Sequence, residues 1–286
     1  MHNKVLACID HSTYSPAVCD CAAWAALRLD APLEFVHVLD RHPEVAQKHD
    51  LSGSIGLDAR ETLLEELAAL DEKRSKIAYE SGRLLLEGAK QRAIADGVAA
   101  PETRQRHGEL VETLAELEKE ARLFVLGKRG EAAESAPQHI GSNLERVVRA
   151  LHRPILVVTK AFTPPRRFVI AFDNSMTTRK GVELIASSPL FKGMSGHVVM
   201  AGTKSSASDQ KLAWAQNVLA TGGIDVHAAV NIDGDAENVI PQYISDNHIE
   251  LLIMGAYGHS RIRQLLVGST TTAMIRTSSV PLLLLR

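Results

Sequence analysis

The sequence predicts an α/β fold in which two tandem, doubly wound domains are each built on a parallel sheet. Short, continuously apolar segments alternate with helical patterns along the 286 residues. Such segments are typical of parallel strands that helices cover on both faces, and right-handed crossovers then give a doubly wound sheet. The length suits two domains. Three blocks of residues also recur in the same order in the two halves, which indicates a duplication.

The repeated blocks are two strands and a Gly-Ser pair. Residues 4–12 and 167–175 each contain a basic residue, five apolar residues, Asp, one further residue and Ser. A second strand, at residues 123–127 and 251–255, ends in glycine, and another glycine follows three residues later in both halves. The Gly-Ser pair is followed in each half by a proline twelve residues after the serine. Because order and spacing agree, we interpret the halves as copies of one unit.

The boundary between the copies is expected near the proline-containing segment 161–165. Two adjacent prolines disfavour helix and keep the chain extended. We therefore predict one domain at residues 1–160 and a second at residues 165–286.

The elements of the second half follow from its apolar patterns. We expect strands at residues 168–172, 197–201, 226–230, 251–254 and 281–285, and helices at residues 177–187, 209–219, 236–247 and 270–277. The first half copies this order. Ligands of such sheets bind beyond the carboxyl ends of the strands, near a topological switch. The residues at those ends are therefore candidates, namely Asp10, Asp173, Gly127 and Gly255.

The first half carries an insertion, which we interpret as a loop at residues 41–56 and a helix at residues 58–96. A row of apolar residues recurs along this helix at helical spacing, with charged residues between them: Leu63, Leu67, Leu70, Ile77 and Leu84. The pattern predicts an amphipathic helix packed on the sheet. A coiled-coil or partner-binding helix is the alternative, but Arg74, Ser81 and Gly88 interrupt its seam.

Composition indicates a cytoplasmic protein without nucleic-acid or membrane partners. The formal net charge is −2, so no global basic field would attract nucleic acid or an anionic membrane. The first residues do not form a signal peptide, and no apolar run approaches the roughly 20 residues of a membrane span. The three cysteines, Cys8, Cys19 and Cys21, fit neither a disulfide framework nor a C-x-x-C motif, and we expect them to be buried in a strand and a helix.

The most informative motif is a glycine loop near the C-terminus. Gly255 and Gly258 are followed by nine residues and then by Gly268, Ser269 and Thr270. Glycine allows the backbone to approach a ligand closely, and the free amides of a helix N-terminus attract anions. The loop between the glycines also carries basic side chains, namely His259, Arg261 and Arg263. The motif predicts a phosphate site, although it matches neither the Walker loop nor the dinucleotide fingerprint.

The spacing G-x2-G-x9-G-[ST] after a buried strand, together with the strand that ends in Asp173-Asn-Ser175, resembles ATP-binding universal stress proteins, most closely their tandem members. The resemblance covers nearly the whole chain. It implies five-stranded sheets, pairing of the two domains through their last strands at residues 153–159 and 280–286, and a homodimer. It also implies a stress-response protein that binds ATP, ADP or AMP, with Mg²⁺ as a possible companion, and that acts through conformation and partners.

The resemblance further implies roles for single residues of the second half. Asp173 would lie near the adenine and ribose, and Ala201 would line the adenine pocket. Met254 and Gly255 would follow at the end of the fourth strand. The phosphates would be held by four residues, namely Gly258, Gly268, Ser269 and Thr270. An alternative role for Asp173, and for Asp10 in the first half, is to position Mg²⁺.

The first half departs from the motif. Its equivalent positions are Asp10, Val38, Leu126, Gly127, Gly130, Gly141, Ser142 and Asn143. Ten residues separate its last two glycines, and Glu131 and Glu134 stand where the second half has His259 and Ile262; Lys128 and Arg129 offset these acids only in part. Carboxylates beside a triphosphate are repelled. We therefore expect the first site to be weak, empty or used for another ligand.

Catalytic and metal sites are not indicated. No nucleophile–base set stands out, so the chain is at most a weak ATPase, and a scaffold with vestigial sites is the other alternative. We expect His37 to be a hydrogen-bonded histidine of a strand near the sheet edge. His42 and His49, with Asp50 nearby, match no standard zinc spacing.

Overall fold

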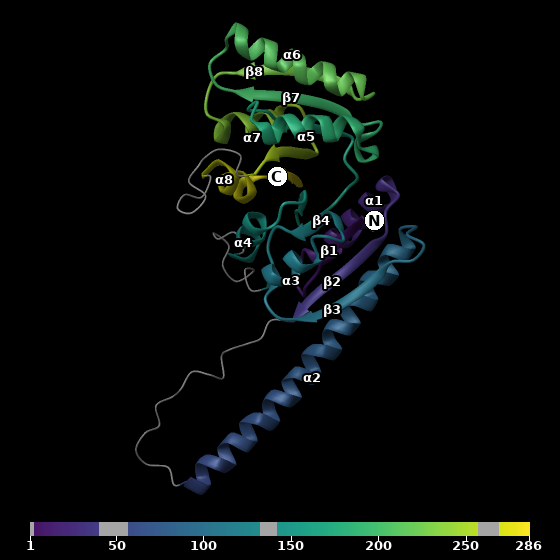
Figure 1. Ribbon diagram of the computed structural model, residues 1–286, viewed down its shortest axis with the longest axis vertical. Coiled ribbons are helices and arrows are strands. Elements are labelled where there is room, and N and C mark those ends of the chain that lie inside the picture. Colours follow the sequence, from purple (N-terminus) through teal and green to yellow (C-terminus); the bar gives the residue numbers. More distant parts are fainter. Residues whose placement is uncertain (1–2, 40–56, 132–141, 257–268) are drawn as a thin grey trace.

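The computed structural model describes the backbone of residues 3–39, 57–131, 142–256 and 269–286 (Figure 1). Strands and helices alternate throughout this part of the chain, as the apolar patterns predict. None of the helices described there is both long and apolar enough to cross a membrane.

The two halves share one element order apart from a short 3-10 helix in the second. The long helix of the first half stands where the second half has a shorter helix, so the predicted insertion lengthens a shared helix and does not add one. The first half contains β1 (Lys4–Cys8), α1 (Ser15–Leu29), β2 (Leu33–Leu39), α2 (Leu57–Ala95), β3 (Glu102–His107), α3 (Leu110–Leu117), β4 (Ala121–Gly127), α4 (Ser142–Ala150) and β5 (Ile155–Val158). The second contains β6 (Arg167–Ala171), α5 (Met176–Ser187), a short 3-10 helix (Pro189–Phe191), β7 (Ser195–Ala201), α6 (Ser206–Thr221), β8 (Asp225–Ile232), α7 (Ala236–Asp246), β9 (Leu251–Gly255), α8 (Ser269–Thr277) and β10 (Leu282–Leu285).

Each half forms a five-stranded parallel sheet, and the predicted fold class is confirmed. The strand order is β3-β2-β1-β4-β5 in the first half and β10-β9-β6-β7-β8 in the second. The two sheets are continuous, because β10 pairs with β5 in the antiparallel direction, with Leu283 opposite Leu156. One mixed, ten-stranded sheet therefore runs through the molecule.

Helices cover both faces of this sheet. Alternate strand residues point to opposite faces, so Val5 and Ala7 belong to one hydrophobic core and Leu6 to the other. Buried residues of α1, the end of α2, α5 and α6 complete the first core. Buried residues of α3, α4, α7 and α8 complete the second. Because helices cover the faces of the sheet, the ends of the strands are the places left for binding sites. We call the end at which the strands finish the carboxyl edge.

The packing of the long helix α2 differs from the prediction. Figure 1 shows the amino-terminal part of α2 extending away from the sheet, and only its carboxyl-terminal part lying against it. The side chains of Leu70, Ile77 and Leu84 are exposed. Leu86 and Ala89 are buried instead, with Ala93 one turn further on. The prediction that the apolar row packs on the sheet is therefore wrong over the part of α2 whose side chains are described, because helical spacing identifies an apolar row but not whether a surface lies opposite it.

Candidate functional site

Four of the predicted site residues meet at the carboxyl edge of the second sheet. β6 lies between β7 and β9, and Ala171 of β6 is paired with Met254 of β9. Asp173 follows two residues after β6 ends, beside Gly255 at the end of β9. On the other side of β6, β7 ends at Ala201. Strand order alone thus gathers residues that are far apart in the sequence.

Asp173 is held at the start of α5. Its Oδ1 accepts hydrogen bonds from the backbone amide of Ser175 (2.9 Å) and from the hydroxyl of Thr178 (2.7 Å). Ser175 in turn caps α5, because its Oγ accepts from the amide of Thr178. Asn174 between them has a φ of 60°, in the left-handed region. The carboxylate therefore has a fixed position at the mouth of the edge, and its side chain is exposed there.

Gly255 allows β9 to end close to α5. A Cβ at this position would lie 3.1 Å from Cγ2 of Thr178 and 3.5 Å from Cγ2 of Thr177. Any larger residue would push against the turn that holds Asp173. Met254 is buried in the core on the α7 and α8 side.

The amino end of α8 completes the described part of the site. The first amides of an α-helix have no partner within the helix, so this end is suited to an anion. Thr270 in its first turn is half-buried, and the hydroxyl of Thr272 is buried without a hydrogen-bond partner among the described residues. Gly258, Gly268 and the side chain of Ser269 lie outside the described residues, so their predicted roles stay predictions.

Sequence reasoning missed three side chains next to Asp173: Asn174, Thr178 and Arg179. The guanidinium of Arg179 donates to Oδ1 of Asn174 (3.1 Å) and lies 3.8 Å from the centre of the Trp214 ring. This arrangement places a fixed positive charge beside the turn that holds the carboxylate of Asp173. The Ser-x-x-Thr spacing after Asp173 is a capping signal that could have identified Thr178.

At the equivalent edge of the first half, Asp10 contacts the loop after β4. Its Oδ1 accepts from the amide of Ser12 (3.0 Å), as in the second half, and its Oδ2 accepts from the amide of Glu131 (2.9 Å). A Cβ at Gly130 would lie 2.8 Å from Oδ2 of Asp10. The start of the loop after β4 is therefore closed onto this carboxylate.

Tyr14 fills further space in the first half. It occupies the position of Thr177 in the repeat and is buried against Gly127. A Cβ added at Gly127 would lie 2.9 Å from Cβ of Tyr14. Lys128 is directed elsewhere, since its Nζ donates to the backbone oxygen of Ser278 (2.8 Å) in the other half. Burial and the nearby Arg129 lower the pKa of Lys128.

The cysteines and His37 lie where the sequence predicts. Cys19 and Cys21 are buried in α1 as predicted, whereas Cys8 lies in β1 as predicted but is only partly buried, since it is the last residue of that strand. Burial raises the pKa of Cys19 to about 12, with the nearby Arg92 opposing this shift. His37 is buried in β2, one strand from the sheet edge, and its Nδ1 lies 2.9 Å from the backbone oxygen of Ile9. His42 and His49 fall outside the described residues.

Comparison with known proteins decides the family. The model of the universal stress protein family matches residues 1–159 and 182–286. The chain belongs to the universal stress protein family. A curated relative, universal stress protein Slr1230 from Synechocystis sp., is 35% identical over 287 residues, which is 99% of this chain and 99% of the relative.

Solved structures show the same fold. A universal stress protein from Archaeoglobus fulgidus DSM 4304 superposes with a TM-score of 0.69 at 18% identity, over 99% of this chain and 96% of that one. A putative universal stress protein from Pseudomonas aeruginosa UCBPP-PA14 gives a TM-score of 0.62 at 15% identity, over 99% of this chain and 92% of that one. The tandem universal stress protein predicted from the repeats is thus confirmed.

Proposed function

We propose that this universal stress protein binds ATP, ADP or AMP at the carboxyl edge of its second sheet and acts in a stress response through its bound conformation and its partners. One observation carries the proposal: Asp173 is fixed by the Ser175–Thr178 turn, and Gly255 at the end of β9 lies against Thr178 of the same turn. A fixed carboxylate, a glycine that permits close approach and a helix amino end are the groups that a sugar and a phosphate chain require.

The residues of this edge would each contact a different part of the nucleotide. Asp173 would accept hydrogen bonds from the ribose, and Ala201, which is only partly buried, would lie against the adenine. Gly258, Gly268, Ser269 and Thr270 would surround the phosphates, and Mg²⁺ would accompany the phosphates if the ligand is ATP. No group of three metal-ligating side chains is found in the part of the chain that the structure describes.

For the first half, we propose that nucleotide binding is weak or absent. In support, Oδ2 of Asp10 already accepts from the amide of Glu131, and Tyr14 is buried against Gly127. The acidic residues Glu131 and Glu134 would repel phosphate in addition.

The test is calorimetric titration of ATP into the full chain and into two matched variants, Gly268→Val and Gly141→Val. We expect one ATP per chain for the wild type and for Gly141→Val, and none for Gly268→Val, because a β-branched side chain prevents close approach of phosphate. If the wild type binds no nucleotide, the scaffold alternative replaces this proposal. If the two variants behave alike, the assignment to the second half is wrong.

A companion assay separates binding from catalysis. Phosphate release from saturating ATP is measured for the wild type and for Gly268→Val. Turnover that disappears in the variant would favour a slow ATPase, whereas tight binding without turnover favours a protein that acts through its bound state.

We also propose a cytoplasmic homodimer, in keeping with the family resemblance. Because β5 and β10 pair with each other within one chain, a second copy would have to use another surface. Light scattering coupled to size exclusion gives the mass directly, and a mass of one chain would contradict the dimer.

A further inference from the structure

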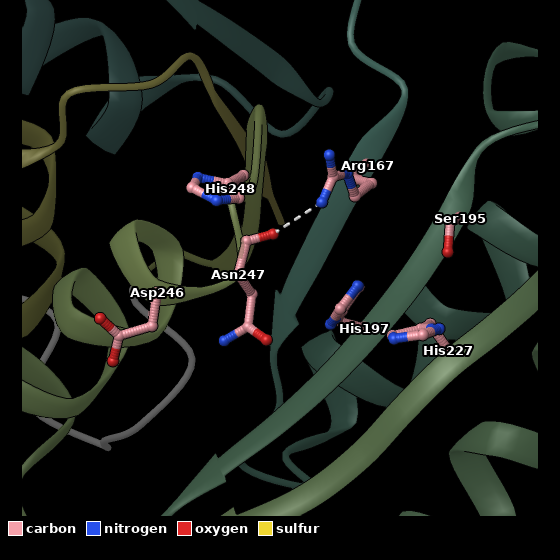
Figure 2. Close-up of a pocket in the computed structure, with 7 residues that line it drawn as sticks. All are labelled: Arg167, Ser195, His197, His227, Asp246, Asn247 and His248. Atoms are coloured by element: carbon pink, nitrogen blue, oxygen red, sulfur yellow. Dashed lines mark hydrogen bonds between the residues drawn. The ribbon is translucent and has the colours of Figure 1, made fainter.

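A second pocket lies at the opposite edge of the second sheet from Asp173. Its side chains come from the amino ends of β6, β7 and β8 and from the turn after α7, and the cavity measures about 270 Å³ (Figure 2). We call it the Arg–His pocket and define it by Arg167, Ser195, His197, His227, Asp246, Asn247 and His248. The universal stress protein motif has no residue at this edge, so the pocket is independent of the nucleotide proposal.

His197 presents an unpaired buried nitrogen. The residue is only 2% exposed, and its Nδ1 lies 2.9 Å from the phenol oxygen of Tyr243. Its Nε2 is buried and has no hydrogen-bond partner among the described residues. Buried side-chain nitrogens are paired in most structures, and an exception calls for a ligand or a water molecule.

The contact between Nδ1 and Tyr243 bears on what Nε2 can do. Burial raises the pKa of Tyr243, so its phenol stays neutral and its hydroxyl can donate to Nδ1. Burial, together with the neighbouring His227 and Arg167, lowers the pKa of His197, so its ring is neutral at neutral pH. A neutral imidazole that accepts at Nδ1 carries its hydrogen on Nε2. With Tyr243 as the donor to Nδ1, the unpaired atom is an N–H that needs an acceptor.

Arg167 places a positive charge beside the same space. Figure 2 shows the guanidinium of Arg167 near His197, and the ring centroids of His197 and His227 lie 5.2 Å apart. Arg167 donates one hydrogen bond to the backbone oxygen of Asn247 (3.2 Å) and makes no other side-chain hydrogen bond or salt bridge within the described residues. Most of its donors remain available.

Two carboxylates lie close to this charge, and both already accept hydrogen bonds. Oδ1 of Asp246 accepts from the side chain of Gln242 (2.8 Å). Oε2 of Glu250 accepts from the backbone amides of Arg166 and Arg167 (2.6 and 3.1 Å). A metal cation would be repelled by the guanidinium, whereas an anion finds a charge and several donors.

We propose that the Arg–His pocket binds a small oxyanion, either a carboxylate or a tetrahedral group such as sulfate or phosphate, through Nε2–H of His197, the guanidinium of Arg167 and the ring of His227. A planar guanidinium suits both shapes because its N–H groups can pair with two oxygens at once. A ligand of this class would be a small metabolite or the acidic end of a larger one.

The test is an NMR titration of the full chain with ¹⁵N-labelled histidine rings. Sodium sulfate and sodium acetate are the probes, and sodium chloride at matched ionic strength is the control; sulfate and acetate do not titrate near neutral pH. We expect saturating shifts of the His197 and His227 rings with sulfate, with acetate or with both. The probe that saturates at the lower concentration identifies the tetrahedral or the carboxylate source. His152, exposed in the first half, serves as the internal control and should not move.

Two variants make the result specific. Arg167→Gln, at an exposed position, should lower the affinity for the saturating probe at least tenfold without unfolding the chain. Tyr243→Phe should change the tautomer of His197, which the ¹⁵N shifts of the ring report directly. Shifts that stay linear with concentration, that equal those in chloride or that survive Arg167→Gln would overturn the proposal. So would saturation by zinc chloride alone in place of either anion.

Discussion

At the scale of the residue, the two aspartates at the repeated strand ends have different environments. Both accept from the amide two residues ahead and from the hydroxyl five residues ahead, which is Thr178 for Asp173 and Ser15 for Asp10. Asp10 accepts in addition from the amide of Glu131, which ties its carboxylate to the loop after β4. The side chain of Asp173 is exposed, whereas that of Asp10 is only partly exposed.

The hydroxyl of Thr178 should contribute more to stability and to ATP binding than the hydroxyl of Thr177. Thr178→Val keeps the shape but removes the donor to Asp173, so we expect a loss of about 1 to 2 kcal/mol in the free energy of unfolding and weaker ATP binding. Thr177→Val is the matched control, because no hydrogen bond of its hydroxyl is found among the described residues, and it should change stability by less than about 0.5 kcal/mol. Urea denaturation of both variants and calorimetry with ATP would check this. Equal effects would mean that Thr178 does not position the carboxylate.

The buried thiols should be inert in the native protein. Because burial raises the pKa of Cys19 to about 12 and that of Cys21 well above its ordinary value, neither forms appreciable thiolate at pH 8. We expect Ellman's reagent to modify them only after denaturation. Rapid modification of either residue in the folded chain, located by peptide mass spectrometry, would contradict the burial of α1.

At the scale of the element, α2 shows how a helix can be regular in pattern and partly unpacked. The side chain of Ile77 is 70% exposed, whereas that of Leu86 is 4% exposed. We expect Ile77→Glu to change the free energy of unfolding by less than about 0.5 kcal/mol and Leu86→Ala to lower it by about 2 to 5 kcal/mol. Thermal and urea unfolding of the two variants measure both values. A large loss for Ile77→Glu would show that a surface covers this part of the helix in solution.

Two glycines of α2 provide a second comparison. A Cβ at Gly88 meets nothing within 4 Å, whereas a Cβ at Gly82 would lie 2.6 Å from both Cδ2 of His37 and Nε2 of Gln105. Gly88→Ala should therefore stabilise the protein by up to about 1 kcal/mol through helix propensity. Gly82→Ala should destabilise it by about 1 to 3 kcal/mol, since the buried His37 ring cannot move freely. If both variants are stabilised, α2 does not lie as close to β2 as the structure places it.

At the scale of the whole molecule, one ladder joins the two halves. Leu156 and Leu283 face each other across the β5–β10 seam, and both are buried. Two side chains add hydrogen bonds between the halves. Lys128 donates to the backbone oxygen of Ser278, and the guanidinium of Arg286 donates to the backbone oxygen of Leu151 (2.9 Å). Large hydrophobic interfaces of this kind resist relative movement of domains.

The halves should therefore unfold together. We expect a single calorimetric transition for the full chain, with equal calorimetric and van't Hoff enthalpies. Leu283→Asp, which places a charge in the seam, should lower the transition temperature and separate it into two transitions. Two transitions already in the wild type would show that the seam contributes little to cooperativity.

Residue patterns were enough to predict the alternation of strands and helices, the duplication and the convergence of Asp173, Ala201, Met254 and Gly255. Each of these follows from local periodicity or from the rule that parallel strands end at one edge. The burial of particular apolar residues of α2 and the hydrogen bond from Thr178 to the carboxylate could not be predicted in this way. Nor could the meeting of the residues of the Arg–His pocket. Burial and hydrogen bonding depend on what lies opposite a side chain, and a residue pattern describes one partner of such a contact but not the other.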